Sequence, residues 1–301
     1  MARLTRRRVA AAITLTSAAI AIAACSAGGT LATSPGSTDV SAGIRPEHIV
    51  QAPKNILASA GPQPNGTMWV LTGSAESRGL FELDPTSGKV FGSISVSSAA
   101  RSVAQAATGV IGLALGTDRA GALELLDGRT AKVIRTVPLS APAREVMVAS
   151  DGTTFYVLTG WGSSSSVTVV DSQDGRVQGT VPVPLEAVSV APDVQQTTLY
   201  VLQRDGRVSQ ISIADGKVAA TFVVGDSGQS LALSPDGTAL YVLKDTDAGA
   251  NVAVVNVATE SVRRVLPAPA NCLEVLVSAS GSQLYEVVGT ASYGNVQIFA
   301  A

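Results

Sequence analysis

The hydrophobic residues of this chain of 301 residues fall into short runs in which apolar and polar positions alternate. Runs such as 200–202 (YVL) and 167–170 (VTVV) are separated by Asp-Gly or Ser-Gly turns. Alternation with a period of two predicts half-buried β-strands, and glycine supplies the positive φ that a tight hairpin needs. The pattern from about residue 45 onward therefore predicts many short strands and an all-β fold.

One unit of about 43 residues repeats six times along this region. Apolar triplets that begin at residues 69, 111, 156, 200, 241 and 285 are spaced by 42, 45, 44, 41 and 44 residues. Each unit has room for four alternating runs, with a sharp turn such as 234–237 (SPDG) before the triplet. Six units of four strands predict a β-propeller. Seven blades are the alternative, although a seventh would need about 43 residues more than the chain has after its N-terminal segment.

The sixth unit ends at residue 301, after its third run. A ring that left this edge unpaired would invite association with other chains. Residues 47–51 (EHIVQ) form a further alternating run ahead of the first unit. We therefore expect this N-terminal segment to supply the missing outer strand and to close the ring.

The segment 234–242 (SPDGTALYV) resembles the YVTN-type propeller repeat. The resemblance extends from about residue 54 to 301 and is close only in the fifth unit, since the first two units keep little of the motif. It implies a propeller fold. Some propellers of this kind are sugar lactonases with acids, Arg and usually His in the channel.

The first 24 residues predict an export signal. They contain Arg3, Arg6, Arg7 and Arg8 and no acidic residue, followed by an apolar run to residue 24. The run ends in 22–25 (IAAC), which resembles the bacterial lipoprotein signal and implies cleavage before Cys25 and lipidation of its thiol, with palmitate among the acyl chains. An ordinary signal peptide with an incidental cysteine is the alternative. Residues 5–9 (TRRRV) also resemble a twin-arginine signal, so either export route stays open.

The expected organisation is a signal peptide over 1–24, a lipidated flexible tether over 25–44 and the propeller over 45–301. Residues 26–41 are rich in Ser, Gly, Thr and Ala, a composition typical of flexible linkers. We expect the mature protein on the extracytoplasmic face of the cell membrane. Without residues 1–24 it would carry 21 − 4 = 17 basic and 23 acidic residues, so the lipid rather than a basic patch would hold it there.

Composition limits the chemistry. A net charge of −2 and a pI near 5.5 argue against a nucleic-acid partner. One His and two Cys argue against metal clusters and disulfide frameworks, and no cofactor, metal or catalytic residue is expected.

Residues 225–228 (GDSG) resemble a serine-protease turn, but the only histidine is His48 and Gln229 follows the turn, so a loop is favoured. Residues 245–249 (DTDAG) lack the later Glu of a calcium loop, and Cys272 is expected to be a buried apolar residue.

The candidate binding residues lie where loops vary between units. Trp161, between glycines, would offer an exposed stacking surface or fold back over a blade. Four polar residues are expected at the starts of the innermost strands, around the channel mouth, where they would bind a small anionic or sugar-like ligand or form a self-satisfied ion network: Arg101, Arg144, Glu186 and Gln229.

These features favour a cell-envelope lipoprotein whose propeller is a non-enzymatic binding or scaffold module. The partner would be an envelope protein, a glycan or a small molecule. A lactonase-like hydrolase that uses the central channel is the alternative, although a single histidine leaves it without its usual general base.

Overall fold

The computed structural model describes residues 45–63, 66–74, 76–118, 120–161, 164–246 and 249–301. Within these residues the regular structure is formed by 24 strands, which confirms the all-β prediction. The same residues include no helix long and apolar enough to span a membrane. The predicted signal peptide, Cys25 and the tether over 25–44 lie outside the described residues.

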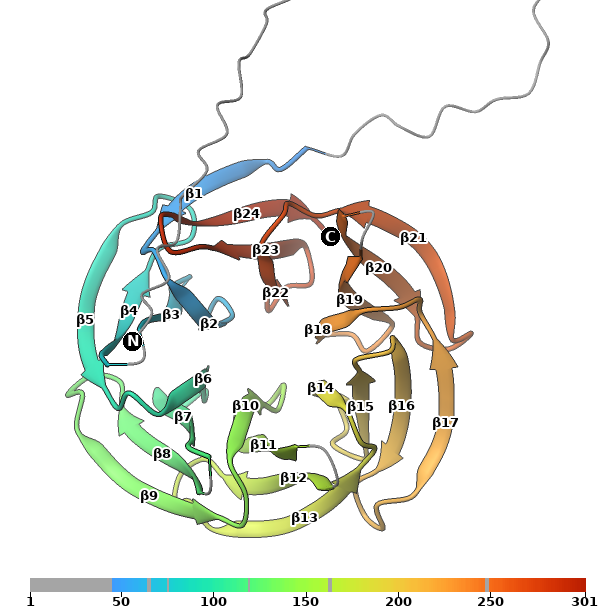
Figure 1. The fold of residues 1–301 in the computed structure, drawn as a ribbon, viewed down its shortest axis with the longest axis horizontal. Coiled ribbons are helices and arrows are strands. Elements are labelled where there is room, and N and C mark those ends of the chain that lie inside the picture. Colours follow the sequence, from blue (N-terminus) through green and yellow to red (C-terminus); the bar gives the residue numbers. More distant parts are fainter. Residues whose placement is uncertain (1–44, 64–65, 75, 119, 162–163, 247–248) are drawn as a thin grey trace, which may run out of the picture. The chain divides into compact units, whose positions relative to one another are not determined.

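The strands form six antiparallel sheets of four strands each. Figure 1 shows these sheets as the blades of a ring, with β2, β6, β10, β14, β18 and β22 as the innermost strands. Blades 1 to 3 contain the first twelve strands after β1: β2 (Ile56–Ala60), β3 (Met68–Gly73), β4 (Arg78–Leu83), β5 (Val90–Val96), β6 (Ala100–Gln105), β7 (Val110–Gly116), β8 (Gly121–Asp127), β9 (Val133–Leu139), β10 (Ala143–Val148), β11 (Thr154–Trp161), β12 (Ser164–Asp171) and β13 (Val177–Val183).

Blades 4 to 6 contain the remaining strands. In blade 6 the outermost strand is β1, from the N-terminal end of the propeller. The strands of blades 4 to 6 are β14 (Ala187–Pro192), β15 (Thr198–Gln203), β16 (Arg207–Ser212), β17 (Val218–Val223), β18 (Gly228–Leu233), β19 (Ala239–Thr246), β20 (Gly249–Asn256), β21 (Ser261–Pro267), β22 (Cys272–Val277), β23 (Gln283–Gly289), β24 (Gly294–Ala300) and β1 (His48–Ala52).

The core consists of apolar layers between neighbouring blades. Between blades 3 and 4, for example, Tyr156 and Leu158 of β11 pack in one cluster with Val190 of β14 and Val201 of β15. The repeated apolar triplets fall in the second strand of each blade, where both faces of the sheet are buried. The outermost strands are mostly exposed. In β13, for example, the first four residues lie in solvent, and only the last three alternate between buried and exposed positions.

The ring is closed by the N-terminal strand. β1 pairs antiparallel with β24, with register from His48 opposite Ile298 to Ala52 opposite Gly294. The prediction that residues 47–51 supply the missing outer strand is therefore confirmed, and the six-blade expectation is confirmed against the seven-blade alternative.

Because the strands are antiparallel, the loops fall on two faces of the ring. We call turn face the one that holds the connections between first and second and between third and fourth strands. We call loop face the one that holds the connections between second and third strands and between successive blades. Most of the tight Asp-Gly turns, such as 151–152 and 236–237, lie on the turn face, although the turn at 205–206 between β15 and β16 lies on the loop face. The loop face also carries the variable loops.

Each innermost strand contains a β-bulge at its second residue, near the loop face. The register against the second strand shifts there in all six blades. These six bulge positions therefore surround the centre of the ring at one level: Leu57, Arg101, Arg144, Val188, Gln229 and Leu273.

The residue after each bulge links neighbouring blades. Its side chain accepts a hydrogen bond from a backbone N–H on the innermost strand of the next blade. In blade 1 this residue is Ala58, which has no acceptor to offer. The other five blades make the bond, at donor–acceptor distances of 2.8 to 3.3 Å: Ser102 with Val146, Glu145 with Val190, Ser189 with Leu231, Ser230 with Val275 and Glu274 with Ser59.

Candidate binding site on the loop face

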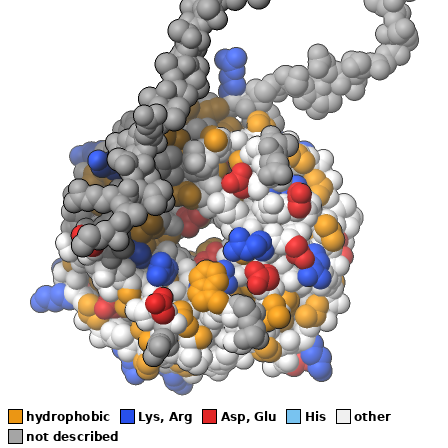
Figure 2. All heavy atoms as spheres, in the orientation of Figure 1, with side chains coloured by type: hydrophobic (Ala, Val, Ile, Leu, Met, Phe, Trp, Pro, Cys, Tyr) orange, Lys and Arg blue, Asp and Glu red, His pale blue; other side chains and the backbone are white. Residues whose placement is uncertain are grey.

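Three arginines and a tryptophan meet at the central opening of the loop face. They line a cavity of about 640 Å³ that extends across the bulge positions of blades 1 to 4. Figure 2 shows basic, acidic and hydrophobic side chains gathered around this opening. We call this cavity the arginine pocket, and its polar and aromatic lining includes Arg78, Arg101, Asp118, Arg144 and Trp161.

Arg144 is fixed by backbone carbonyls and by an aromatic ring. Its Nη1 donates to the carbonyl of Ala187 at 2.6 Å and to that of Gly160 at 3.5 Å. Its Cζ lies 3.7 Å from the centroid of the Trp161 ring, a cation–π contact. Burial lowers the pKa of the guanidinium, and its Nε is buried without a hydrogen-bond partner in the described part of the chain.

Trp161 is the last residue of β11. The strand extends this far because Trp161 pairs with Ser164 of β12. Its side chain is nevertheless 60 % exposed. With the Arg144 guanidinium stacked against the ring, this residue offers the exposed surface that the sequence suggested.

Arg101 and Arg78 complete the basic lining. Arg101 Nε donates to the carbonyl of Gly116 at 3.2 Å, and Arg78 Nε donates to that of Ser74 at 3.5 Å. Burial lowers the pKa of Arg78, and the positive charge of Arg101, which lines the same cavity, lowers it further. Arg78 Nη1 is buried and has no partner among the described residues.

Glycines present the carbonyls that hold two of these arginines. A Cβ on Gly116, which accepts from Arg101, would lie 2.3 Å from the carbonyl oxygen of Ala143 in the next blade. Gly160, which accepts from Arg144, has a φ of 86°. A larger residue at either position would displace the backbone that orients the guanidiniums.

No described carboxylate lies within ion-pair distance of the three arginines, since the ion pairs in this part of the chain involve other residues. The self-satisfied ion network that the sequence allowed is therefore not what Arg101 and Arg144 form. Arg78, which sequence reasoning missed, belongs to the same pocket. Its position at the start of β4, in a variable loop, was the available signal.

Glu186 lies outside the arginine pocket, and its alignment with the ring of innermost residues is wrong. It precedes β14 with a φ of 59°, and the bulge position of that blade is Val188. Counting back along the sequence missed this shift. Gln229 does occupy the bulge position of blade 5, but it does not line the arginine pocket, and its buried Oε1 has no described partner.

Glu186 belongs instead to a neighbouring cavity of about 760 Å³ on the loop face. There it pairs with Arg204 at 3.6 Å, and Asp205 pairs with Arg207 at 2.8 Å. All four side chains are at least half exposed, so these pairs contribute little to stability. With Asp226 also in the lining, acidic side chains outnumber basic ones in this cavity, whereas basic side chains predominate in the arginine pocket.

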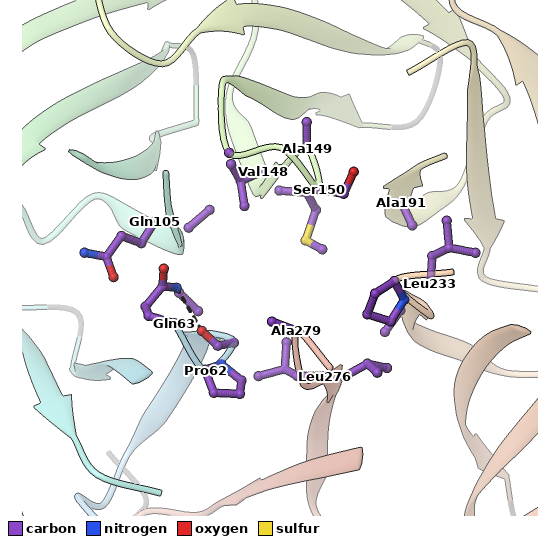
Figure 3. Close-up of a pocket in the computed structure, with 18 of the residues that line it drawn as sticks. Pro62, Gln63, Gln105, Val148, Ala149, Ser150, Ala191, Leu233, Leu276 and Ala279 are labelled. Carbon is purple, nitrogen blue, oxygen red and sulfur yellow. Dashed lines mark hydrogen bonds between the residues drawn. The ribbon is translucent and has the colours of Figure 1, made fainter. Parts of the chain in front are cut away.

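The central opening on the turn face differs from the arginine pocket in the polarity of its lining. It leads into a cavity of about 320 Å³ lined mostly by small and apolar side chains, such as Ala149, Ala191, Leu233 and Leu276 (Figure 3). The described residues of this lining include no ionisable side chain. Gln63 donates to the carbonyl of Gly61 at 2.9 Å and so uses its amide within its own loop.

The other residues that the sequence analysis considered lie in a connection between blades, on the outer strand β1 and in the core. Residues 225–227 connect β17 to β18, and His48 is exposed on β1. Cys272 is buried as expected, and burial raises the pKa of its thiol well above the usual range. The described residues contain no cluster of His, Cys, Asp or Glu side chains that could hold a metal ion.

Comparison with known proteins supports the fold alone. No protein-family model matches the chain, and no curated protein matches its sequence. A solved structure of Kuenenia stuttgartiensis hydrazine synthase superposes with a TM-score of 0.65 and 16 % sequence identity, over 81 % of this chain and 83 % of that one. At this identity the similarity defines the class of the protein as a six-bladed β-propeller and carries no activity with it.

Proposed function

We propose that this chain is a cell-envelope lipoprotein whose propeller is a non-enzymatic binding module that acts through the loop face. The observation that carries the binding proposal is the arginine pocket. It combines three guanidiniums that have no carboxylate partner among the described residues with an exposed indole. A rigid ring that holds many loops at one opening suits recognition.

The proposed location in the cell envelope follows from the N-terminal sequence. The basic residues 3–8, the apolar run and the sequence IAAC at 22–25 support export and attachment of lipid to Cys25. The acyl chains, palmitate among them, would hold the acidic propeller at the extracytoplasmic face of the membrane.

Capture from envelope extract tests the binding proposal. A soluble form without residues 1–25 is used as bait, with Trp161→Ala and Arg144→Ala as variants and Arg129→Gln as a matched control. Arg129 is exposed between β8 and β9, on the turn face. We expect both loop-face variants, and not the control, to lose a partner that the wild-type bait retains. Retention of every partner by both variants contradicts the proposal.

A lactonase-like hydrolase is the second candidate. Arg101, Arg144 and Glu186 would be its polar residues, but the chain has one histidine, which is exposed on the outer strand β1. That candidate gains support if a panel of lactones and esters is turned over and turnover depends on any of these three residues. We expect no such turnover.

A further inference from the structure

We infer that the arginine pocket binds an oxyanion, a carboxylate or a phosphate, carried on a ring that stacks against Trp161. The inference rests on the proposed binding function and adds the chemical class of the ligand. Arg78, which was not among the candidate residues from the sequence, is one of its anion-binding residues.

The first argument is charge. The protein carries more acidic than basic residues, 23 against 21, so a gathering of arginines at one opening is not a consequence of general composition. In the neighbouring cavity each arginine has a carboxylate within 4 Å, whereas in the arginine pocket none of the three has one among the described residues. Like charges held together with no described carboxylate in ion-pair contact favour the binding of an anion.

The second argument is hydrogen bonding. Arg78 Nη1 and Arg144 Nε are buried donors without described partners, and an unsatisfied buried donor destabilises the structure that contains it. Arg78 is held by one carbonyl oxygen, and Arg144 by two carbonyl oxygens and the Trp161 ring, so the remaining N–H groups are oriented before a ligand arrives. Carboxylate and phosphate oxygens match the planar fork of a guanidinium.

The third argument is the indole. One side of Trp161 is covered by Arg144, and the ring is still 60 % exposed. A sugar or aromatic ring placed on it would bury apolar surface beside the charged group. Asp118 at the rim would repel a second negative charge on the far side of the ligand, which favours one compact anionic group.

Tryptophan fluorescence of the full-length chain in detergent solution tests the inference. Trp161 is the exposed indole, whereas Trp69 is 4 % exposed and donates to Gln105 at 3.1 Å. Glucuronate, glucose 6-phosphate and neutral glucose are the probes, so the carboxylate and phosphate sources are separated. We expect at least one anionic probe to change the fluorescence saturably, with an affinity at least about tenfold above that of glucose and weaker at high salt.

Substitutions assign the donors. We expect Arg78→Gln and Arg101→Gln each to weaken the anionic probe by about tenfold or more, since each removes charge-assisted hydrogen bonds. Arg101→Lys should restore part of the loss, and Arg129→Gln on the turn face should change nothing. Far-ultraviolet circular dichroism and thermal melts verify that each variant is folded.

Three results overturn the inference: no response to either anion, equal affinity for glucose, or an equal loss in the Arg129→Gln control. None of these results contradicts the proposed binding function. That function is contradicted separately if the Trp161→Ala and Arg144→Ala baits keep every envelope partner.

Discussion

The carboxylate of Glu274 in β22 accepts two hydrogen bonds from Ser59 in β2, one from the backbone N–H at 2.8 Å and one from the hydroxyl at 2.6 Å. This contact joins the last blade to the first. Glu145 makes the equivalent contact between blades 3 and 4, through Ser189 and Val190. The ring is therefore closed at its centre by a side chain as well as at its rim by the pairing of β1 with β24.

Removal of the Glu274 carboxylate should weaken this closure. Glu274→Ala leaves the N–H and hydroxyl of Ser59 without their acceptor, and we expect the free energy of unfolding to fall by about 1–3 kcal/mol. Ser230→Ala removes one such bond, to Val275, and should cost less. Chemical denaturation of both variants measures the difference, and an equal cost would contradict a special role for the blade 6 to blade 1 seam.

Glu286 should make stability depend on pH. It is fully buried, its two carboxylate oxygens have no described partner, and burial raises its pKa to about 7. The folded chain therefore holds this proton more tightly than the unfolded chain. The free energy of unfolding should be highest below about pH 4.5 and fall as the pH rises to about 7, by on the order of 3 kcal/mol for this group.

Glu286→Val tests that dependence. Val157, Val201 and Val242 hold the equivalent buried position in blades 3 to 5, so valine fits there. We expect the variant to be more stable than wild type and the gain to be larger at pH 8 than at pH 5. Burial also raises the pKa of Glu145 and Glu274 to about 7, so part of the pH dependence should remain. A gain that is the same at both pH values would contradict the titration of Glu286.

The N-terminal strand β1 should be needed for the ring to stay monomeric and to unfold cooperatively. A chain that lacks residues 1–52 loses β1 and exposes the edge of β24, whereas one that lacks residues 1–44 keeps β1. We expect the shorter chain to associate in size-exclusion chromatography and to unfold less cooperatively, because an unpaired edge strand pairs with other chains. Identical behaviour of the two chains would show that β1 is dispensable.

Cys25 should hold the protein at the membrane. We expect Cys25→Ala to lose lipid and to shift from the membrane to the soluble fraction when cells are fractionated. The matched control is Ser26→Ala, the neighbouring residue, which should remain with the membrane. A Cys25→Ala chain that stays membrane-bound and is processed at the same site would refute lipidation at this residue.

The fold could be predicted because the repeat places similar residues at similar positions in every blade. The apolar triplets mark the second strands, and the missing outer strand of blade 6 points to β1. The unusual character of Glu286 was also readable, since the same alignment sets it against valines. The residues of the arginine pocket were harder to predict. The positions of Arg101, Arg144 and Trp161 within single repeat units made them candidates, whereas the arrangement of several blades brings Arg78 next to them. Glu186 falls outside the expected ring because it precedes β14, where Val188 holds the bulge position.

Site-specific photocrosslinking in living cells tests most directly whether the loop face binds the partner. A photoreactive amino acid replaces Asp118, at the rim of the arginine pocket, or Thr130, exposed on the turn face. We predict that irradiation gives a discrete adduct from position 118 that disappears in the Arg144→Ala background, and none from position 130. Adducts from position 130 alone, or an adduct from position 118 that is unchanged by Arg144→Ala, would contradict binding at the arginine pocket.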